Sequence, residues 1–475
     1  MFLGYMLDVT RGKVPKLEEI FVLIDKLASL GYSHLELYIE HAFMFEGKES
    51  AWRDASPLSP DDIKKIDSYA KSKGIELVPN CNTFGHLERF LKHDEFKHLA
   101  ECDPPYYEET AKAYRQGVIV VDEAGLNFVD SLLASYTKYF ESNKLNIGCD
   151  ETFELGMGRC QEYCRKVGKG RLYLEGLQKI YKLAKNYAEN IYFWGDIILK
   201  YPELISELPK DATVLNWGYE DNHPFAEETK KIADSGLKFI VCPGTSSWNS
   251  VAGRSKNMLG NIISAQINAE KNGAEGILLT DWGDRGHMQY SYLSYAGICA
   301  ASIAFHEGAE NLTEAKVIAK VNEVFFNDKN SPFGEIILEL GHLHEVFKTK
   351  RINVTLFNVG LIYEDYPGGP IFMDGITKEE IDEAARKFEI LKKKFEKVAD
   401  SSLVCREMKN TLRLVEVAIS RLYQNKNLPY DKVKAYQLVT EAIAEHCALW
   451  LERNRIGGME EGLGHLEKAR NSFLK

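Results

Sequence analysis

Eight short apolar runs, each followed by an amphipathic helical pattern or a long loop, extend from residue 1 to about residue 305 of this 475-residue chain. Helices and strands that alternate in this way build a parallel sheet, and eight such units predict a closed (β/α)8 barrel, the TIM barrel. The runs lie at residues 3–8, 34–39, 75–80, 145–150, 191–195, 213–217, 237–242 and 276–281. The clearest helical patterns between them are Leu17–Leu30, Asp61–Lys73, Leu172–Ala188, Glu227–Ser235 and Ile262–Asn272.

A doubly wound open sheet is the alternative arrangement of alternating strands and helices. Such sheets usually have fewer strands and carry a glycine-rich phosphate-binding turn after the first strand. Here the first turn reads Asp-Val-Thr-Arg-Gly over residues 8–12, without the G-x-G-x-x-G pattern. The barrel is therefore the favoured fold.

The longest interval between predicted strands covers residues 81–144 and contains the segment Asp103-Pro104-Pro105-Tyr106-Tyr107. Because proline disrupts both helices and strand ladders, we expect this segment to be irregular and to belong to an insertion on the catalytic face. Beyond residue 310 the strand patterns fade and long helical patterns follow, at Lys378–Val398, Leu403–Gln424 and Asp431–Asn454. We therefore predict a catalytic barrel at residues 1–310 and an all-helical C-terminal domain at 311–475.

Composition restricts the partners and the location of the chain. A formal net charge of -11, with basic residues interspersed among acids, argues against nucleic acid as a partner. Nine irregularly spaced cysteines form no disulfide framework, and the sequence contains no signal-peptide pattern and no apolar stretch that could span a membrane. We expect a cytoplasmic protein without a membrane partner; the sequence makes no prediction of oligomeric state.

The predicted strand ends share one chemical character. In a TIM barrel the active site lies at the C-terminal ends of the strands. The run at 145–149 ends in the adjacent acids Asp150 and Glu151, which we place at a strand end because a strand interior excludes charge. The other side chains at or just past strand ends include Asp8, Arg11, Glu40, the segment Asn80–His86, Trp194, Asp196, Trp217, Tyr219, Trp248 and the segment Asp281–Asp284.

Acids, one arginine and aromatic rings at one barrel mouth are typical of a sugar-binding site. Four of the six tryptophans fall at these ends: Trp194, Trp217, Trp248 and Trp282. The C–H face of a pyranose packs on indole rings, while carboxylates and arginine bind its hydroxyl groups. With no metal motif and no nucleotide-binding loop, the sequence predicts a small oligosaccharide or glycoside substrate and no cofactor.

Four segments together resemble the catalytic domain of glycoside hydrolase family 20, the β-N-acetylhexosaminidases. They are Leu7-Asp8-Val9-Thr10-Arg11, Ile147-Gly148-Cys149-Asp150-Glu151, Phe193-Trp194-Gly195-Asp196 and Asp281-Trp282-Gly283-Asp284. The resemblance extends in order from residue 1 to about 305. The N-terminal α+β domain that is usual in the family has no counterpart here, and the helical C-terminal region resembles nothing in a typical member.

The resemblance implies a retaining, substrate-assisted hydrolysis. Glu151 would act as general acid and base, while the 2-acetamido oxygen of the substrate would attack the anomeric carbon to give an oxazolinium ion. Asp150 would orient the acetamide and stabilise the charge on its nitrogen. Two neighbouring residues cannot flank a sugar ring on opposite faces. One of them can, however, reach the leaving group while the other holds the acetamide, as a substrate-assisted mechanism requires.

The same resemblance assigns roles to further residues. Arg11 would bind ring hydroxyls, and His86 would contact Glu151 with Glu40 behind it, where a typical member has aspartate. Walls around the acetamide and the ring would come from Trp194, Trp217 and Trp282, with Trp248 beside them, and Asp284 would hold O4 or O6. In place of the tyrosine that usually binds the acetamide oxygen, residues 242–248 read Cys-Pro-Gly-Thr-Ser-Ser-Trp. Tyr219, or a serine of that loop, would have to substitute.

The sequence also allows two other functions. A barrel glycosidase for another sugar would use two enzyme carboxylates, with Asp196 or Asp284 as the second acid across the ring from Glu151. A non-catalytic sugar-binding protein would keep the tryptophans but would have no need of Asp150 and Glu151. The presence of both acids favours the enzyme.

Overall fold

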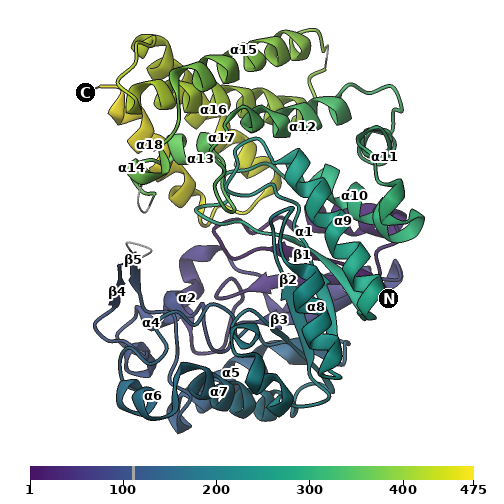
Figure 1. The fold of residues 1–475 in the computed structure, drawn as a ribbon, viewed down its shortest axis with the longest axis vertical. Helices are drawn as coiled ribbons and strands as arrows, with labels where there is room; N and C mark the ends of the chain where they lie inside the picture. Colours follow the sequence, from purple (N-terminus) through teal and green to yellow (C-terminus); the bar gives the residue numbers. More distant parts are fainter. Residues whose placement is uncertain (110–112, 367–368, 399, 475) are drawn as a thin grey trace.

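The computed structural model describes residues 1–109, 113–366, 369–398 and 400–474, and it confirms the TIM barrel. Eight parallel strands close in the order β1-β2-β3-β6-β7-β8-β9-β10, and β10 pairs with β1 (Figure 1). Seven of the eight predicted strands agree with the structure within one residue at each end. The strands are β1 (Phe2–Asp8), β2 (His34–Ile39), β3 (Glu76–Cys81), β6 (Lys144–Asn146), β7 (Asn190–Trp194), β8 (Thr213–Trp217), β9 (Lys238–Cys242) and β10 (Gly276–Asp281).

The predicted strand at 145–150 is wrong beyond Asn146, where β6 ends. Gly148 and Cys149 have φ angles of 70° and 71°, in the left-handed region, so the backbone turns out of the ladder. The N–H of Ile147 still donates to the carbonyl of Tyr192 at 2.9 Å, which keeps the departing chain against β7. Asp150 therefore lies on a loop above the strand rather than at its last position.

Helices follow most strands and pack around the barrel: α1 (Leu17–Ser29), α3 (Pro60–Ser72), α7 (Lys169–Ala184), α8 (Phe225–Asp234), α9 (Ser255–Asn272) and α10 (Tyr295–Glu307). After β7 the chain forms two 3-10 turns, Ile198–Lys200 and Pro202–Glu207, where an α-helix would otherwise stand. The helix predicted at Leu172–Ala188 ends at Ala184, because the residues after it turn toward β7.

The helix predicted at Ile262–Asn272 begins seven residues earlier, at Ser255. Its first turns carry buried polar side chains that hide the apolar periodicity. Asn257 donates to the carbonyl of Tyr219 at 2.6 Å, and Asn261 donates to that of Gly218 at 2.9 Å. These amides tie the loop after β8 to α9.

The interval at 81–144 contains α4 (Glu88–Leu91), α5 (Glu123–Tyr136) and a two-stranded antiparallel hairpin of β4 (Tyr106–Glu108) and β5 (Ala113–Arg115). Asp103-Pro104-Pro105 is irregular, as expected. The same expectation was wrong for Tyr106 and Tyr107, which pair with Arg115 and Tyr114 in the hairpin.

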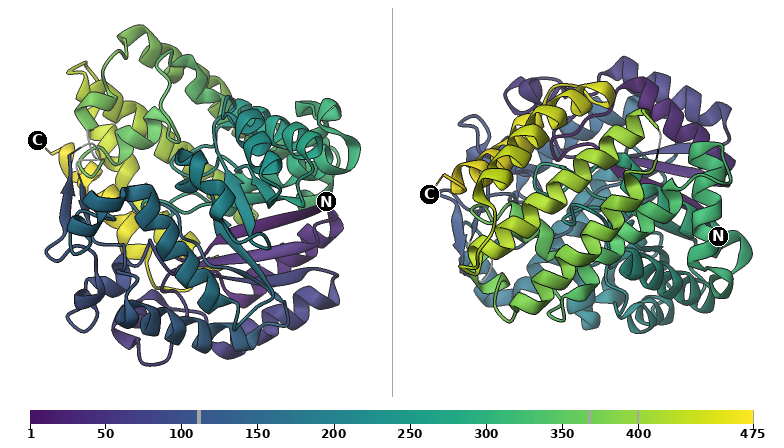
Figure 2. Two further views of the ribbon diagram at one scale, coloured as in Figure 1. Left: turned by 60° about the horizontal axis from the view of Figure 1, so that its bottom comes forward. Right: turned by 90° about the horizontal axis from the view of Figure 1, so that it is seen from above.

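After α10 the described chain is helical, with no further strand, and most of its helices gather on one side of the barrel, at the top of Figure 1 (Figures 1 and 2). The three long helices predicted there are present as α15 (Lys378–Phe395), α16 (Leu403–Asn425) and α17 (Lys432–Arg453). The other helices of this region are α11 (Glu314–Phe326), α12 (Phe333–His342), α13 (Leu356–Leu361), α14 (Gly369–Phe372) and α18 (Met459–Ser472). Asn454, just past α17, bridges to Pro15 in the loop after β1. Within the described ranges no helix is long and apolar enough to cross a membrane.

A buried carboxyl group joins three strands inside the barrel. Glu36 of β2 is fully buried and accepts hydrogen bonds from His34 Nε2 at 2.8 Å, Asn80 Nδ2 at 2.8 Å and Asn146 Nδ2 at 2.9 Å. Asn80 lies on β3 and Asn146 on β6, and these two residues are the register partners that join the two strands. The Glu36 carboxyl therefore reinforces the part of the barrel from which the Asp150 loop departs.

We predict that Glu36→Ala lowers the free energy of unfolding by about 3 kcal/mol or more, because it leaves three buried donors without an acceptor. Denaturant unfolding followed by circular dichroism measures this change. Glu389→Ala, at an exposed position in α15, should change the stability by less than about 0.5 kcal/mol. Equal effects of the two substitutions would show that the Glu36 network does not stabilise the barrel.

Candidate active site

The loop after β6 presents two adjacent carboxylates in different environments. Glu151 has a φ of 48°, a left-handed conformation that is strained in a non-glycine residue, and its N–H donates to Asp196 Oδ2 at 3.3 Å. The loop is held from below by Tyr173, whose hydroxyl donates to the carbonyl of Cys149 at 2.9 Å. Asp150 is buried, whereas the Glu151 side chain is 36% exposed. Glu151 is thus the more accessible of the two acids.

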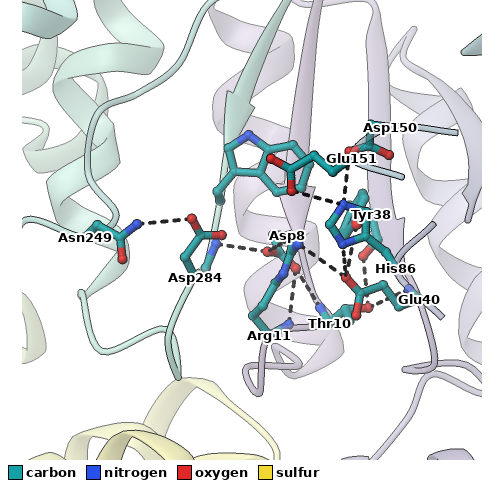
Figure 3. A network of polar contacts seen from close by, with 12 residues as sticks. Asp8, Thr10, Arg11, Tyr38, Glu40, His86, Asp150, Glu151, Asn249 and Asp284 are labelled. Atoms are coloured by element: carbon teal, nitrogen blue, oxygen red, sulfur yellow. Dashed lines mark hydrogen bonds and ion pairs between the residues drawn. The ribbon is translucent and has the colours of Figure 1, made fainter. Parts of the chain in front are cut away.

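His86 brings the two carboxylates together (Figure 3). Its Nε2 lies 3.2 Å from Asp150 Oδ2 and 3.5 Å from Glu151 Oε2, and its Nδ1 lies 3.7 Å from Glu40 Oε1. The structure therefore places Glu40, His86 and Glu151 in the order that the sequence predicted. It adds a closer contact to Asp150 that the sequence did not suggest.

The charges around His86 shift several proton equilibria. Burial by itself lowers the pKa of His86, but the adjacent Asp150 carboxylate raises it well above the ordinary value overall. Burial, followed by the charges of Asp150 and Asp284, raises the pKa of Glu151, although His86 and Arg11 act in the opposite direction. Burial raises the pKa of Glu40 to about 7. The site therefore combines a cationic histidine with a glutamic acid that keeps its proton to higher pH than usual.

Arg11 is fixed on several sides. Its Nη1 lies 3.0 Å from Asp8 Oδ2 and its Nη2 lies 3.3 Å from Glu40 Oε1. The guanidinium carbon lies 4.8 Å from the centre of the Tyr38 ring and 5.1 Å from that of Trp282. Held in this way, the guanidinium can bind a ligand hydroxyl without reorganising.

Aromatic side chains form the walls of the site. Trp194 and Trp248 are fully buried, and the Trp217 ring stacks on Tyr219 at a centroid distance of 5.1 Å. Tyr219 also meets Trp248 edge to face at 5.1 Å. Its hydroxyl accepts a hydrogen bond of 2.7 Å from the indole N–H of Trp282. A hydroxyl oxygen that accepts from an indole can direct its own proton elsewhere.

The hydroxyl groups of Thr245, Ser246 and Ser247, in the loop after β9, do not line the cavity that contains Glu151. Thr245 Oγ1 and Ser247 Oγ donate to Asp281 Oδ1 at 2.7 Å and 2.8 Å. Ser246 Oγ accepts from Asn257 Nδ2 at 3.0 Å. Of the two substitutes considered for the absent tyrosine, Tyr219 is therefore better placed than a serine of this loop.

One cavity collects nearly all of the predicted residues. Glu40, which lies behind His86, and Asp196 do not line this cavity. Burial, followed by the charges of Asp150 and Glu151, raises the pKa of Asp196 to about 8. In the described part of the chain, no group of three or more His, Cys, Asp or Glu residues is arranged to hold a metal ion. The residues that line the cavity are Arg11, His86, Asp150, Glu151, Trp194, Trp217, Tyr219, Trp248, Trp282, Asp284 and Asn353.

Three residues of this region were missed by sequence reasoning. The Tyr38 hydroxyl donates to Glu40 Oε1 at 3.0 Å, Asn249 Nδ2 donates to Asp284 Oδ2 at 3.1 Å, and Asn353 lines the cavity. Tyr38 is the next-to-last residue of β2, and Asn249 directly follows Trp248, so both could have been found from their positions. Asn353 lies far beyond the last strand, in a segment with no pattern to mark it.

The chain is similar in sequence to proteins that are already known. A model of the glycosyl hydrolase family 20 catalytic domain matches residues 1–256. Human Hexosaminidase D is 28% identical over 217 residues, which cover 44% of this chain and 43% of the human protein. Bovine Hexosaminidase D is 26% identical over 244 residues, which cover 48% of this chain and 67% of the bovine protein. The match thus spans less than half the length of the human relative.

Solved structures share the fold. The Flavobacterium johnsoniae chitobiase superposes with a TM-score of 0.56 and 13% identity, covering 100% of this chain and 78% of that one. A β-N-acetylhexosaminidase from Bacteroides fragilis superposes with a TM-score of 0.53 and 16% identity, covering 69% of this chain and 71% of the other.

Proposed function

Because the chain belongs to glycosyl hydrolase family 20, we propose that it is a retaining exo-β-N-acetylhexosaminidase that removes terminal β-linked GlcNAc or GalNAc. The observation that carries this proposal is the pairing of a buried Asp150 with an accessible Glu151 on one loop, both in contact with His86. The names of the human and bovine relatives support a hexosaminidase.

The two acids suit the two parts of a substrate-assisted reaction. Glu151, with its raised pKa, donates its proton to the glycosidic oxygen as the bond from C1 to that oxygen breaks. The 2-acetamido oxygen forms a bond to C1, and the resulting positive charge on the acetamide nitrogen lies beside Asp150. Water then attacks C1, and the bond from C1 to the acetamide oxygen breaks, so the ring of the intermediate reopens. The attacking water gives up a proton to the Glu151 carboxylate, which restores the acid.

The alternative with two enzyme carboxylates receives less support. A second acid would have to face the sugar ring from across the cavity. Asp196 accepts a hydrogen bond from the Glu151 backbone and does not line the cavity. Asp284 lines the cavity, but its Oδ2 accepts from Asn249, an arrangement that suits a residue binding hydroxyl groups.

The effect on kcat/KM of removing the Glu151 proton should depend on the leaving group. We predict that Glu151→Gln lowers kcat/KM for chitobiose by about 10²–10⁴-fold and lowers it much less for a 2,4-dinitrophenyl glycoside, whose leaving group needs no proton. Because the pKa of Glu151 is raised, wild-type kcat/KM for chitobiose should decrease as the pH rises through that pKa. This alkaline limb should be missing from the variant. Equal losses on both substrates would exclude Glu151 as the acid.

An analogue of the cyclised intermediate tests the role of Asp150. We predict that Asp150→Asn impairs the cleavage of 2-acetamido glycosides, and that a thiazoline analogue of the cyclised intermediate inhibits the wild-type protein strongly and the variant weakly. Inhibition constants and kcat/KM for aryl glycosides measure both effects. Rapid cleavage of 2-hydroxy glycosides, together with failure of the thiazoline to bind, would favour the mechanism with two carboxylates.

Tyr219 should hold the acetamide oxygen. A well-placed donor at a developing charge contributes on the order of 3 kcal/mol, so we predict that Tyr219→Phe lowers kcat/KM for 2-acetamido substrates by at least about tenfold. Tyr32→Phe is the matched control, since the Tyr32 hydroxyl is also buried and donates to the carbonyl of Ile298 at 2.8 Å, away from the cavity. Unimpaired catalysis by a folded Tyr219→Phe protein would assign the acetamide to another residue.

A further inference from the structure

We propose that Asn353 is a sugar-binding residue supplied by the C-terminal region, whose side-chain amide donates a hydrogen bond to a hydroxyl group at C4 or C6 of the terminal 2-acetamido sugar. The inference rests on the proposed function and extends it to a segment outside the matched catalytic domain, which ends at residue 256. Among the described residues that line the cavity, Asn353 is the one that comes from beyond α10.

The backbone of Asn353 is clamped to the barrel. Its N–H donates to Glu220 Oε1 at 2.7 Å, and the same oxygen accepts from Arg254 Nη1 at 2.7 Å. The Arg254 side chain is only 3% exposed, so Glu220 is held by a buried cation. Asn353 itself has a φ of 55°, a left-handed conformation that asparagine tolerates better than most residues. These contacts fix the position from which the side chain enters the cavity.

The orientation of the amide follows from its neighbours. Arg254 Nη2 lies 3.5 Å from Asn353 Oδ1, and an arginine can only donate, so the oxygen end of the amide faces Arg254. The Nδ2 end has no acceptor in the described part of the protein. An amide donor without a partner, at the wall of a cavity rich in carboxylates and indoles, can bind a hydroxyl oxygen of a ligand.

The contacts of the neighbouring segment place Asn353 on the Asp284 side of the cavity. The N–H of Thr355 donates to the carbonyl of Asn249 at 3.0 Å, and Asn249 in turn donates to Asp284. In Figure 3, Asn249 and Asp284 lie at one end of the polar network, and Asp150 and His86 lie at the other. C1 of the sugar must face Glu151, so the far end of the ring, with its C4 and C6 hydroxyl groups, faces Asp284 and Asn353.

The test uses Asn353→Gly, which removes the amide and leaves a residue that adopts the left-handed backbone without strain. The substrates are 4-nitrophenyl β-glycosides of GlcNAc, 4-deoxy-GlcNAc and 6-deoxy-GlcNAc. We expect kcat/KM for the GlcNAc glycoside to fall about tenfold, as for the loss of one hydrogen bond. The loss should persist on one deoxy substrate and disappear on the other, which lacks the hydroxyl group that Asn353 binds.

Asn327→Gly is the matched control, because Asn327 is exposed at the end of α11 and has a φ of 52°. It should leave all three kcat/KM values unchanged. An Asn353→Gly protein with wild-type melting temperature that loses activity equally on the three substrates, or loses none, would overturn the proposal for Asn353 alone. A wild-type protein that cleaves none of the three, nor the 4-nitrophenyl β-glycoside of GalNAc, would overturn the proposed function, and the role of Asn353 with it.

Discussion

A histidine between two adjacent carboxylates is the interaction on which the rest of the site depends. Asp150 and Glu151 follow one another in the chain, and two like charges so close together would repel unless one kept its proton or a cation lay between them. His86 supplies that cation, since its Nε2 contacts both acids and its Nδ1 faces Glu40. Burial and the nearby Asp150 carboxylate raise the pKa of Glu151 even though His86 acts in the opposite direction, and the Asp150 carboxylate also raises the pKa of His86.

This arrangement requires strained backbone and close contacts between loops of the barrel. Gly148, Cys149 and Glu151 are left-handed, and so is His86. A Cβ atom on Gly85 would lie 2.5 Å from the carbonyl oxygen of Asp150, so the two loops can approach each other only because position 85 has no side chain. Below them, the Glu36 network and the Tyr173 hydroxyl support the strand end and the loop. The chemistry therefore relies on a strained loop seated on a well-bonded barrel.

Most of this architecture could be predicted from the sequence, because each strand is a short apolar run that ends at a polar or aromatic residue. Strand positions such as 213–217 and 276–281 could be predicted to the residue. The end of β6 could not, because left-handed backbone at Cys149 leaves no mark in composition. The start of α9 was hidden because Asn257 and Asn261 are buried and bonded to loop carbonyls. Asn353 enters the cavity through tertiary contacts alone.

In the proposed mechanism the 2-acetamido oxygen of the substrate, rather than an enzyme carboxylate, attacks the anomeric carbon. Replacing the acetyl hydrogens by one, two and three fluorine atoms withdraws electrons from that oxygen stepwise, with little change in shape. The most direct measurement is kcat/KM for the 4-nitrophenyl glycosides of this N-acyl series. A steep, regular decrease with each fluorine is expected if the acetamide oxygen attacks, whereas a kcat/KM that does not depend on fluorination would show that another group is the nucleophile.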